Sequence, residues 1–543
     1  MRIVLQINTL DINKRMNHYL ISVNDPDLVD VLAQIIEVDF DLSLEQAKLL
    51  ITTRVIEHLQ RFKDDTKLVI ERGYVDRVYR DSFYTYYASK RTHYCKDTIK
   101  LSFFEDHDDK ICSLDVFAEH ESVAFLNDCY RGFIVLRPTI PFVVGRSAIA
   151  PALLKINSFK TCLTTIPSTC MGLQFEVQAF PFSSQDTETI SCAETMIWAL
   201  MEYYGNKYPE YSPVLPSKIL NVLRQNVVER QLPSSGLSVE SMSYLLKECG
   251  FGPKLYSRDE FEEDFDLLLS SYVESGIPII VALDNAKLVQ EKKVDRLIGH
   301  AALCIGHENI SKKQVEDILP RDYHIQESEK VLKIRDWDCI KKNFVFIDDN
   351  FPVYQSDNLD TPTGRYVDIP ENRFLNKEAK TKSDKEWGSC IISHFVVPLY
   401  KRIYLEAYMA KKIVYKLLCS DYFNFADKRE LYIRTFLCSA RVYRDYAMLS
   451  DMGTDLKNII LNKSLPRYVW VTEVSDDMSI GQNRAKGLIL LDATEANVSD
   501  FRPLIFALCN GYQVQYDKKH KAFVSSQEKI EPFTMYESSL KYL

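Results

Sequence analysis

Hydrophobic side chains recur at two different spacings in the first part of this chain. Between Asp27 and Phe62 they return every three or four positions, as in an amphipathic helix. Apolar residues alternate with polar ones over 99–103, which predicts a strand, and the run Phe133–Leu136 predicts another. We therefore expect a mixed α+β domain over residues 1–150, to which the pattern assigns no chemistry.

After about Gln174 the pattern changes to helices followed by strands. A helix is predicted from Cys192 to Gly205, with Ser191 as its N-cap and Gly205 as its C-cap. Further helices are predicted over 217–229 and 239–249, and the apolar runs IIVAL, HAALCI and FVFI then predict strands. Helices that precede a sheet are typical of the α+β class.

The last part of the chain predicts a third unit. The lysine-rich segment 376–387 has the composition of a solvated loop, and amphipathic helices are predicted over 404–418 and 430–448. Strands are predicted at 468–471 and 487–491. With the usual size of domains, these patterns divide the chain into an N-terminal domain at 1–150, a core at 172–400 and a C-terminal α+β domain or subdomain at 401–543.

Composition and charge argue against several classes of protein, including nucleic-acid-binding and membrane-spanning ones. The 543 residues are 46% apolar and 26% charged, which is typical of globular proteins, and the formal net charge of −9 argues against a nucleic-acid partner. No apolar run reaches the roughly 18 residues of a membrane span, and the N-terminus lacks the apolar core of a signal peptide. Thirteen scattered cysteines without a CxxC pair favour free thiols in the cytoplasm and no metal site.

The strongest chemical signal is a cysteine at a helix N-terminus. Cys192 directly follows the predicted N-cap Ser191. The unpaired N–H groups and partial positive charge of such a helix end favour a thiolate and also face a developing oxyanion. Most cysteines are structural thiols, but this position favours a nucleophile. Gln185, seven residues before Cys192, can add a side-chain N–H to the oxyanion site.

Partners for this thiol are predicted at two strand ends. His300 opens the strand HAALCI and can take the thiol proton, whereas His307, seven residues later, faces the other side of a regular strand. The strand FVFI ends in Asp348, Asp349 and Asn350. An acceptor from this group can bind the second ring nitrogen of the histidine and fix its tautomer.

Along the chain, the glutamine, the cysteine with its helix, the histidine strand and the acidic end of the next strand follow one another. This order resembles that of papain-like cysteine peptidases, in particular the bacteriocin-processing (double-glycine leader) type. The matching stretches are SQDTETISCAETMIWALMEYYG, SSGLSVESMSYLLKECGFGPKLYS, GIPIIVALDN, GHAALCIGHE and FVFIDDN, and they cover about residues 180–355. The resemblance implies a papain-like core of a helical half and an antiparallel sheet. It does not extend to the regions on either side, and no transporter domain is recognised.

The resemblance also implies roles for single residues. Cys192 is then the nucleophile, His300 the base and Gln185 the oxyanion glutamine, while the register slightly favours Asp349 over Asp348 as the third member. The sequence departs from the family pattern at three points. The glutamine stands seven rather than six residues before the cysteine, Ala follows the cysteine, and the acid lies 49 residues after the histidine (349 minus 300). The polar insert 309–342 accounts for much of that gap and is expected to form an extra hairpin or a lid.

These features predict a cysteine peptidase or related amide hydrolase that acts on a peptide or protein substrate. It would work through a Cys-His-Asp triad and a thioester acyl-enzyme, without a metal or organic cofactor. Two alternatives stay open at this point. An acyl transferase or deamidase can use the same triad, and the core can also be a non-catalytic binding module. Oligomeric state, cleavage specificity and the roles of the flanking regions stay open too.

Overall fold

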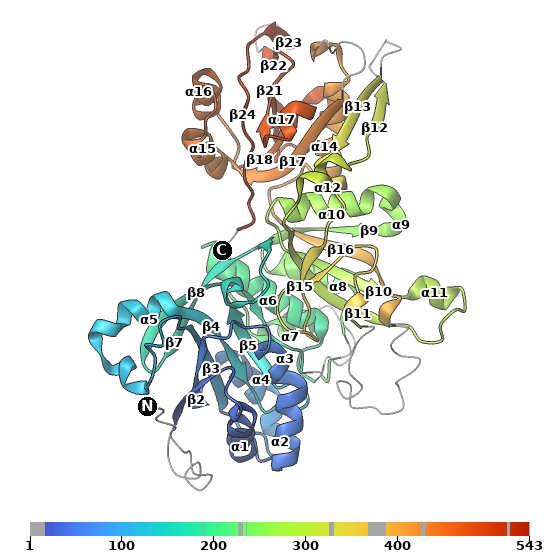
Figure 1. The fold of residues 1–543 in the computed structure, drawn as a ribbon. Coiled ribbons are helices and arrows are strands. Elements are labelled where there is room, and N and C mark those ends of the chain that lie inside the picture. The colour runs from blue at the N-terminus through green and yellow to red at the C-terminus, as the bar shows by residue number, and fades with distance from the viewer. Residues whose placement is uncertain are drawn as a thin grey trace.

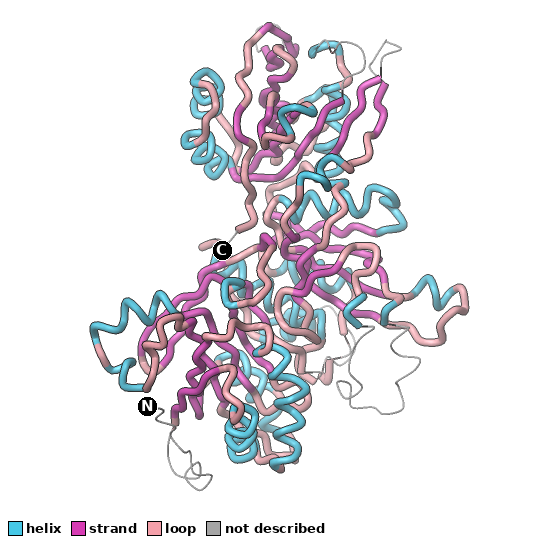
Figure 2. Tube along the Cα trace, in the orientation of Figure 1, coloured by secondary structure: helices cyan, strands magenta, loops and turns pink. Residues whose placement is uncertain are grey.

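The computed structural model describes residues 17–186, 188–225, 232–234, 236–324, 331–366, 387–423, 425, 430–517 and 522–541. Within these residues the chain forms three large sheets, with helices packed against them (Figures 1 and 2). The strands pair antiparallel except for one parallel pair in the C-terminal sheet. The fold is therefore α+β, as the sequence predicts.

The N-terminal sheet has seven strands and is drawn in blue to cyan in Figure 1. Alternate residues of its strands enter different apolar clusters: Leu68 and Ile70 pack with the helices that follow β1, whereas Val69 packs against the β7–β8 hairpin. In sheet order the strands are β1 (His18–Ser22), β2 (Thr66–Tyr74), β3 (Thr98–Glu105), β4 (Tyr130–Leu136), β5 (Val144–Ile149), β8 (Leu173–Phe182) and β7 (Thr164–Cys170). The helices are α1 (Leu28–Phe40), α2 (Leu44–Leu50), η1 (Ile51–Val55), α3 (Ile56–Leu59), α4 (Arg77–Thr85) and α5 (Val123–Cys129).

The middle sheet contains the three predicted strand runs as neighbours, which confirms that part of the prediction. Its order is β15 (Gln355–Asp357), β14 (Phe344–Ile347), β11 (Gly299–Glu308), β10 (Ile279–Asp284), β16 (Ile391–Tyr400) and β9 (Phe251–Ser257), and β6 (Phe159–Thr161) also pairs with β11. The helices of this part are α6 (Cys192–Lys207), α7 (Pro216–Leu223), α8 (Val239–Glu248), α9 (Arg258–Phe261), α10 (Phe265–Glu274) and α11 (Ala286–Gln290). Helix α6 contacts β11 of this sheet as well as β7 and β8 of the N-terminal sheet.

The C-terminal sheet draws two of its strands from the polar insert 309–342. This insert forms α12 (Lys312–Glu316) and the hairpin of β12 (Arg321–His324) and β13 (Val331–Asp336), and β13 pairs parallel with β17. The remaining strands, in order, are β17 (Glu430–Ser439), β18 (Tyr468–Ser475), β20 (Gly487–Asp492), β21 (Leu504–Cys509), β22 (Tyr512–Asp517) and β23 (Ala522–Gln527). Other elements are α14 (Ala407–Leu418), α15 (Ala440–Leu449), α16 (Thr454–Asn462), α17 (Asp477–Ile480), β19 (Arg484–Ala485) and β24 (Phe533–Thr534).

The chain end returns to the middle of the molecule, beside the N-terminal and middle sheets (Figure 1). There Lys541 forms an antiparallel bridge with Thr161, next to the β6–β11 pairing. The unit expected at 401–543 therefore shares strands and contacts with earlier parts of the chain, and the sheet of the unit expected at 1–150 continues to Phe182.

Two predictions of local structure are wrong. The segment 430–448 is not one helix, because its first ten residues form β17 in the interior of the C-terminal sheet. A strand buried on both faces reads as a continuous apolar run, which also fits a helical period. Gly205 does not end its helix, which continues to Lys207; a Cβ atom at this position would lie 2.4 Å from Pro213. Of the predicted loop 376–387, residues 376–386 lie outside the described residues.

Candidate active site

Cys192 is the first residue of α6, as its sequence context predicts. The N-cap Ser191 is extended, and its N–H donates to the Glu194 carboxylate across 3.2 Å in a capping box. The body of α6 is buried from Ala193 to Tyr204, whereas Cys192 stays partly exposed. The helix is thus fixed by its apolar body while its first residue reaches the surface with unpaired N–H groups.

The structure brings His300 to this thiol. His300 is the second residue of β11 and is almost fully buried. Burial alone would lower the pKa of His300, but the charge and hydrogen bond of Asp348, together with a hydrogen bond and charge from Cys192, raise the pKa well above its ordinary value. The contacts of His300 therefore favour its imidazolium form beside Cys192.

Asp348 is the carboxylate in hydrogen-bond contact with this histidine. Its Oδ1 lies 3.0 Å from His300 Nε2, whereas Oδ1 of Asp349 lies 3.7 Å from the same atom. The pairing of Leu303 with Ile347 sets the end of β14 beside the start of β11, so the residue after Ile347 meets His300. The distances thus favour Asp348, the alternative third member, over Asp349.

Two residues that the sequence analysis missed hold this carboxylate. Both belong to η8 (Gly364–Tyr366): Arg365 Nη2 lies 2.6 Å from Asp348 Oδ2, and the Tyr366 hydroxyl donates to both Asp348 oxygens at 3.0 and 2.9 Å. Burial by itself would raise the pKa of Asp348, but His300 and Arg365 hold it well below its usual range. An isolated Arg-Tyr pair after a loop carries no recognisable pattern, so no sequence signal could have found it.

Aromatic rings cover the buried side of the histidine. Trp387 stacks on Tyr366 with 4.6 Å between ring centroids and a 7° angle, and its ring centroid lies 5.5 Å from that of His300 at an angle of 73°. The Tyr366 hydroxyl also lies 3.1 Å from His300 Nε2. These rings keep water from the His300–Asp348 contact, which strengthens a charged hydrogen bond.

Asp349 lines a small cavity together with Arg54, His58 and Ser184 of the preceding segments. Neither of its carboxylate oxygens makes a well-aligned hydrogen bond. Burial, and then the neighbouring charge of Asp348, raise the pKa of Asp349 to about 7, although His300 opposes this. Asp349 is therefore a buried acid that changes charge near neutral pH.

Gln185 and Asn350 also belong to this group of residues. The Gln185 side-chain amide donates to Asn350 Oδ1 at 3.3 Å, and the Asn350 amide donates to the Tyr366 hydroxyl at 3.2 Å. The seven-residue spacing between Gln185 and Cys192 is accommodated by a turn in which Asp186 accepts from the N–H groups of residues 188, 189 and 190.

An arginine of the N-terminal sheet fixes the backbone before this turn. Arg137 follows β4 and is 2% exposed, and its Nη2 donates to the carbonyls of Ser184 and Gln185 at 2.7 and 2.8 Å. The N-terminal domain thus reaches the candidate oxyanion glutamine. In the sequence Arg137 only follows the predicted strand Phe133–Leu136, and its partners lie 47 and 48 positions away.

His307 lies in a different place, as the strand alternation predicts. Its Nε2 is 3.0 Å from Glu274 Oε2 of α10, and Glu274 also contacts Arg434 of β17 at 3.2 Å. This buried pair joins the middle and C-terminal sheets, and it leaves His300 as the histidine beside Cys192.

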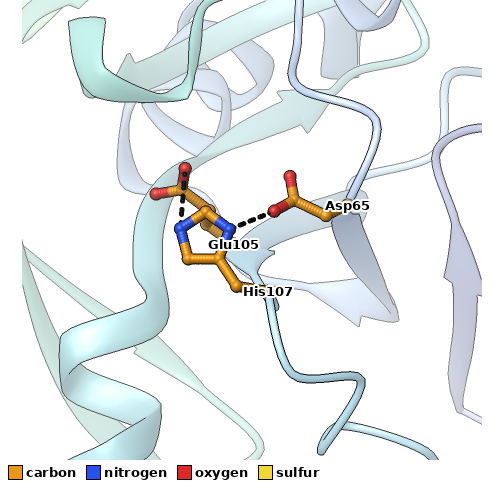
Figure 3. Close-up of side chains that lie close together, drawn as sticks. All are labelled: Asp65, Glu105 and His107. Carbon is orange, nitrogen blue, oxygen red and sulfur yellow. Dashed lines mark ion pairs between the residues drawn. The ribbon is translucent and has the colours of Figure 1, made fainter.

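Two groups of side chains in the described residues have atoms close enough to surround a cation. One is His300 with Asp348 and Asp349, where the Arg365 guanidinium opposes a second positive charge. The other is Asp65, Glu105 and His107 (Figure 3), where His107 bridges the two acids and lies 3.5 Å from Glu105 Oε1. Lys63 and Arg131 already pair with Glu105. Both groups therefore have the character of ion-pair clusters.

Comparison with known proteins adds no family assignment. A scan against protein-family models finds no match for this chain, and no curated protein matches its sequence. Among the described residues, no helix combines the length and apolarity needed to span a membrane.

Proposed function

We propose that this protein is a cysteine peptidase or related amide hydrolase with a papain-like core and a peptide or protein substrate. One observation carries the proposal: Cys192, at the exposed start of α6, contacts His300, whose Nε2 is held by Asp348 at 3.0 Å. A nucleophile, a base and an orienting acid in hydrogen-bond sequence are the parts that acyl transfer needs.

The first half of the reaction forms an acyl-enzyme. The Cys192 thiolate attacks the amide carbon, and the carbonyl electrons move onto oxygen. Unpaired N–H groups at the start of α6 and the Gln185 side chain stabilise this oxyanion. As the C–N bond breaks, protonated His300 gives its proton to the leaving amine, and a thioester remains on Cys192.

The second half releases the acid. Neutral His300 removes a proton from water, and the resulting hydroxide attacks the thioester carbon. The C–S bond breaks, and the thiolate–imidazolium pair returns. Asp348 keeps the Nε2 proton in place throughout, so Nδ1 is the ring nitrogen that exchanges protons with thiol, amine and water.

A thiolate nucleophile needs a reducing setting, and we propose a cytoplasmic location. All thirteen cysteines lie in the described residues and are free thiols. Nine of them, among them Cys162, Cys304 and Cys390, have their pKa raised by burial. These buried thiols provide internal reference rates for the labelling experiment described below.

The experiment is iodoacetamide labelling against pH, with each site mapped by mass spectrometry. Wild type is compared with His300→Ala and with His324→Ala, which removes an exposed histidine at the end of β12. We expect Cys192 to label fastest of the thirteen cysteines and to stay reactive below pH 7, and His300→Ala alone to abolish this. An ordinary or absent reaction at Cys192 would contradict the hydrolase and favour a binding module. A positive result leads to assays on peptide and isopeptide amides.

A further inference from the structure

The N-terminal sheet contains a fully buried lysine whose ammonium group touches a serine. Lys100, in the middle of β3, has no exposed surface, and its Nζ lies 2.8 Å from Ser168 Oγ of β7. It also donates to the Thr169 carbonyl. Lysines are almost never fully buried unless an ion pair compensates the charge. No carboxylate lies within ion-pair distance of this one among the described residues.

The surroundings of Lys100 favour the neutral amine. Burial lowers the pKa of Lys100 to about 8, against the opposing charge of Glu71. The rings of Tyr74 and Phe133 lie 4.9 and 4.8 Å from Nζ and support the ammonium form when it is present. The other ionisable groups that act on it are Cys170, Arg146 and Asp76. A lysine with this pKa can accept a proton near neutral pH.

A second hydroxyl group completes the cluster. The Tyr130 hydroxyl of β4 is buried next to Ser168, close enough to interact with it but without a well-aligned hydrogen bond. Ser168 therefore lies between an amine that can remove its proton and a phenol that can relay one. None of these three residues takes part in the Cys192 site.

Ser168 is also open to a ligand. It is half-buried and lines a cavity of about 760 Å³ on this side of the sheet. Two amide side chains, Asn127 and Gln174, and two aromatic ones, Tyr74 and Phe175, share the lining. Glu176 is the charged residue of this lining, so the cavity fits an uncharged or cationic molecule with groups that can hydrogen-bond.

We propose that Ser168 and Lys100 form a second acyl-transfer site, which hydrolyses esters or amides whose acyl or alcohol part is uncharged or cationic. Serine-lysine pairs are a known variant of the nucleophile–base arrangement. The proposal stands on the 2.8 Å contact, the complete burial of the lysine and the opening of the serine to the cavity. It is independent of the function proposed for Cys192.

The reaction balances with these residues and water. Neutral Lys100 takes the Ser168 proton while Oγ bonds to the carbonyl carbon, whose π electrons move to oxygen. The tetrahedral adduct expels the alcohol or amine, which takes the proton from Lys100, and an acyl-serine remains. Lys100 then deprotonates water, which attacks the acyl-serine. The acid leaves, and the proton on Lys100 returns to Oγ.

The test uses the full-length Cys192→Ala protein, so that the thiol cannot react. A fluorophosphonate probe is applied between pH 6 and 10, and its adducts are mapped by mass spectrometry. We expect an adduct at Ser168 whose rate of formation rises through about pH 8. This rate should fall at least about 100-fold in Lys100→Met, and the adduct should be absent in Ser168→Ala. The exposed Ser158 serves as the internal reference serine.

Two results would overturn the proposal. One is a Ser168 that reacts no faster than Ser158 over this pH range in protein with an intact near-ultraviolet circular dichroism spectrum. The other is a Lys100→Met variant that folds and still labels at the parent rate, since Lys100 would then only anchor the β7–β8 hairpin. If Lys100→Met fails to fold, the pH dependence at Ser168 in the parent protein decides, because a serine without a base shows no rise centred near pH 8.

Discussion

His300 Nε2 lies 3.0 Å from Asp348 Oδ1 and 3.7 Å from Asp349 Oδ1. Two adjacent acids thus approach one ring nitrogen, but only Asp348 is also held by Arg365 and Tyr366. Because this pairing occupies Nε2, Nδ1 is left for the thiol of Cys192. The two acids therefore have different roles, which can be separated by substitution.

Asp348→Asn should lower kcat/KM for amide hydrolysis by about 100- to 10,000-fold, because an amide does not hold the required tautomer of His300. Asp349→Asn, the matched control one residue away, should lower it by less than about tenfold. Steady-state kinetics on any cleaved peptide measures both. Equal losses in the two variants would mean that Asp349 shares the orienting role.

The free energy of unfolding should depend on pH through the protonation of Asp349. Its pKa is raised to about 7 in the folded state, so the folded chain binds more protons than the unfolded chain between about pH 4 and 7. The stability from this group is present at acid pH and is lost as the pH rises through 7. Asp349→Asn should therefore stabilise the protein at pH 8 relative to pH 5, by up to about 4 kcal/mol. Urea unfolding at the two pH values measures this difference, and an identical pH dependence in wild type and variant would contradict it.

Arg137 should act on the oxyanion site rather than on the thiol. Arg137→Met frees the backbone of Ser184 and Gln185, so kcat should fall by about 10- to 100-fold with little change in KM. Alkylation of Cys192 should keep its wild-type rate and pH profile, which a general loss of structure would not allow. Arg137→Lys should recover part of kcat, because one ammonium can still reach a carbonyl.

A loss of Cys192 alkylation in Arg137→Met, in parallel with the loss of kcat, would contradict this assignment. It would indicate that the N-terminal domain stabilises the whole core rather than the position of Gln185.

The buried amine of Lys411 should stabilise the junction of the middle and C-terminal sheets. Its Nζ lies 2.7 Å from both Asp336 Oδ2 and Asp338 Oδ2, and Asp338 also accepts from Ser270 and Ser271 of α10. Lys411→Met leaves two buried carboxylates without their cation, so it should cost about 3–5 kcal/mol of unfolding free energy at pH 7.

The loss in Lys411→Met should shrink at pH 5, because the two carboxylates can then take up protons; burial already raises the pKa of Asp338. Lys412→Met, an exposed neighbour on the same helix, is the control and should change stability by less than about 0.5 kcal/mol. A loss in Lys411→Met that does not depend on pH would point to packing rather than charge.

The sequence by itself determined the elements that rest on local patterns. Cys192 follows a capping residue and precedes an apolar helix, and His300 opens a buried strand; both facts are visible within about 15 residues. Local patterns also predict strands β10, β11 and β14. In contrast, the pattern at β17 predicts a helix, because a strand buried on both faces has no period of two to reveal it.

Only the tertiary structure decided which side chains meet. The choice of Asp348 over Asp349 depends on the register between β11 and β14. Arg365 and Tyr366 contact Asp348 from 17 or more positions along the chain. Arg137 lies 163 positions before His300 (300 minus 137) and reaches the site by binding the Gln185 carbonyl. The same holds for Lys100 and Ser168, which are 68 positions apart. Hydrogen bonds and burial between distant segments leave no periodic trace in a sequence, because they arise only when the strands have paired and the helices have packed.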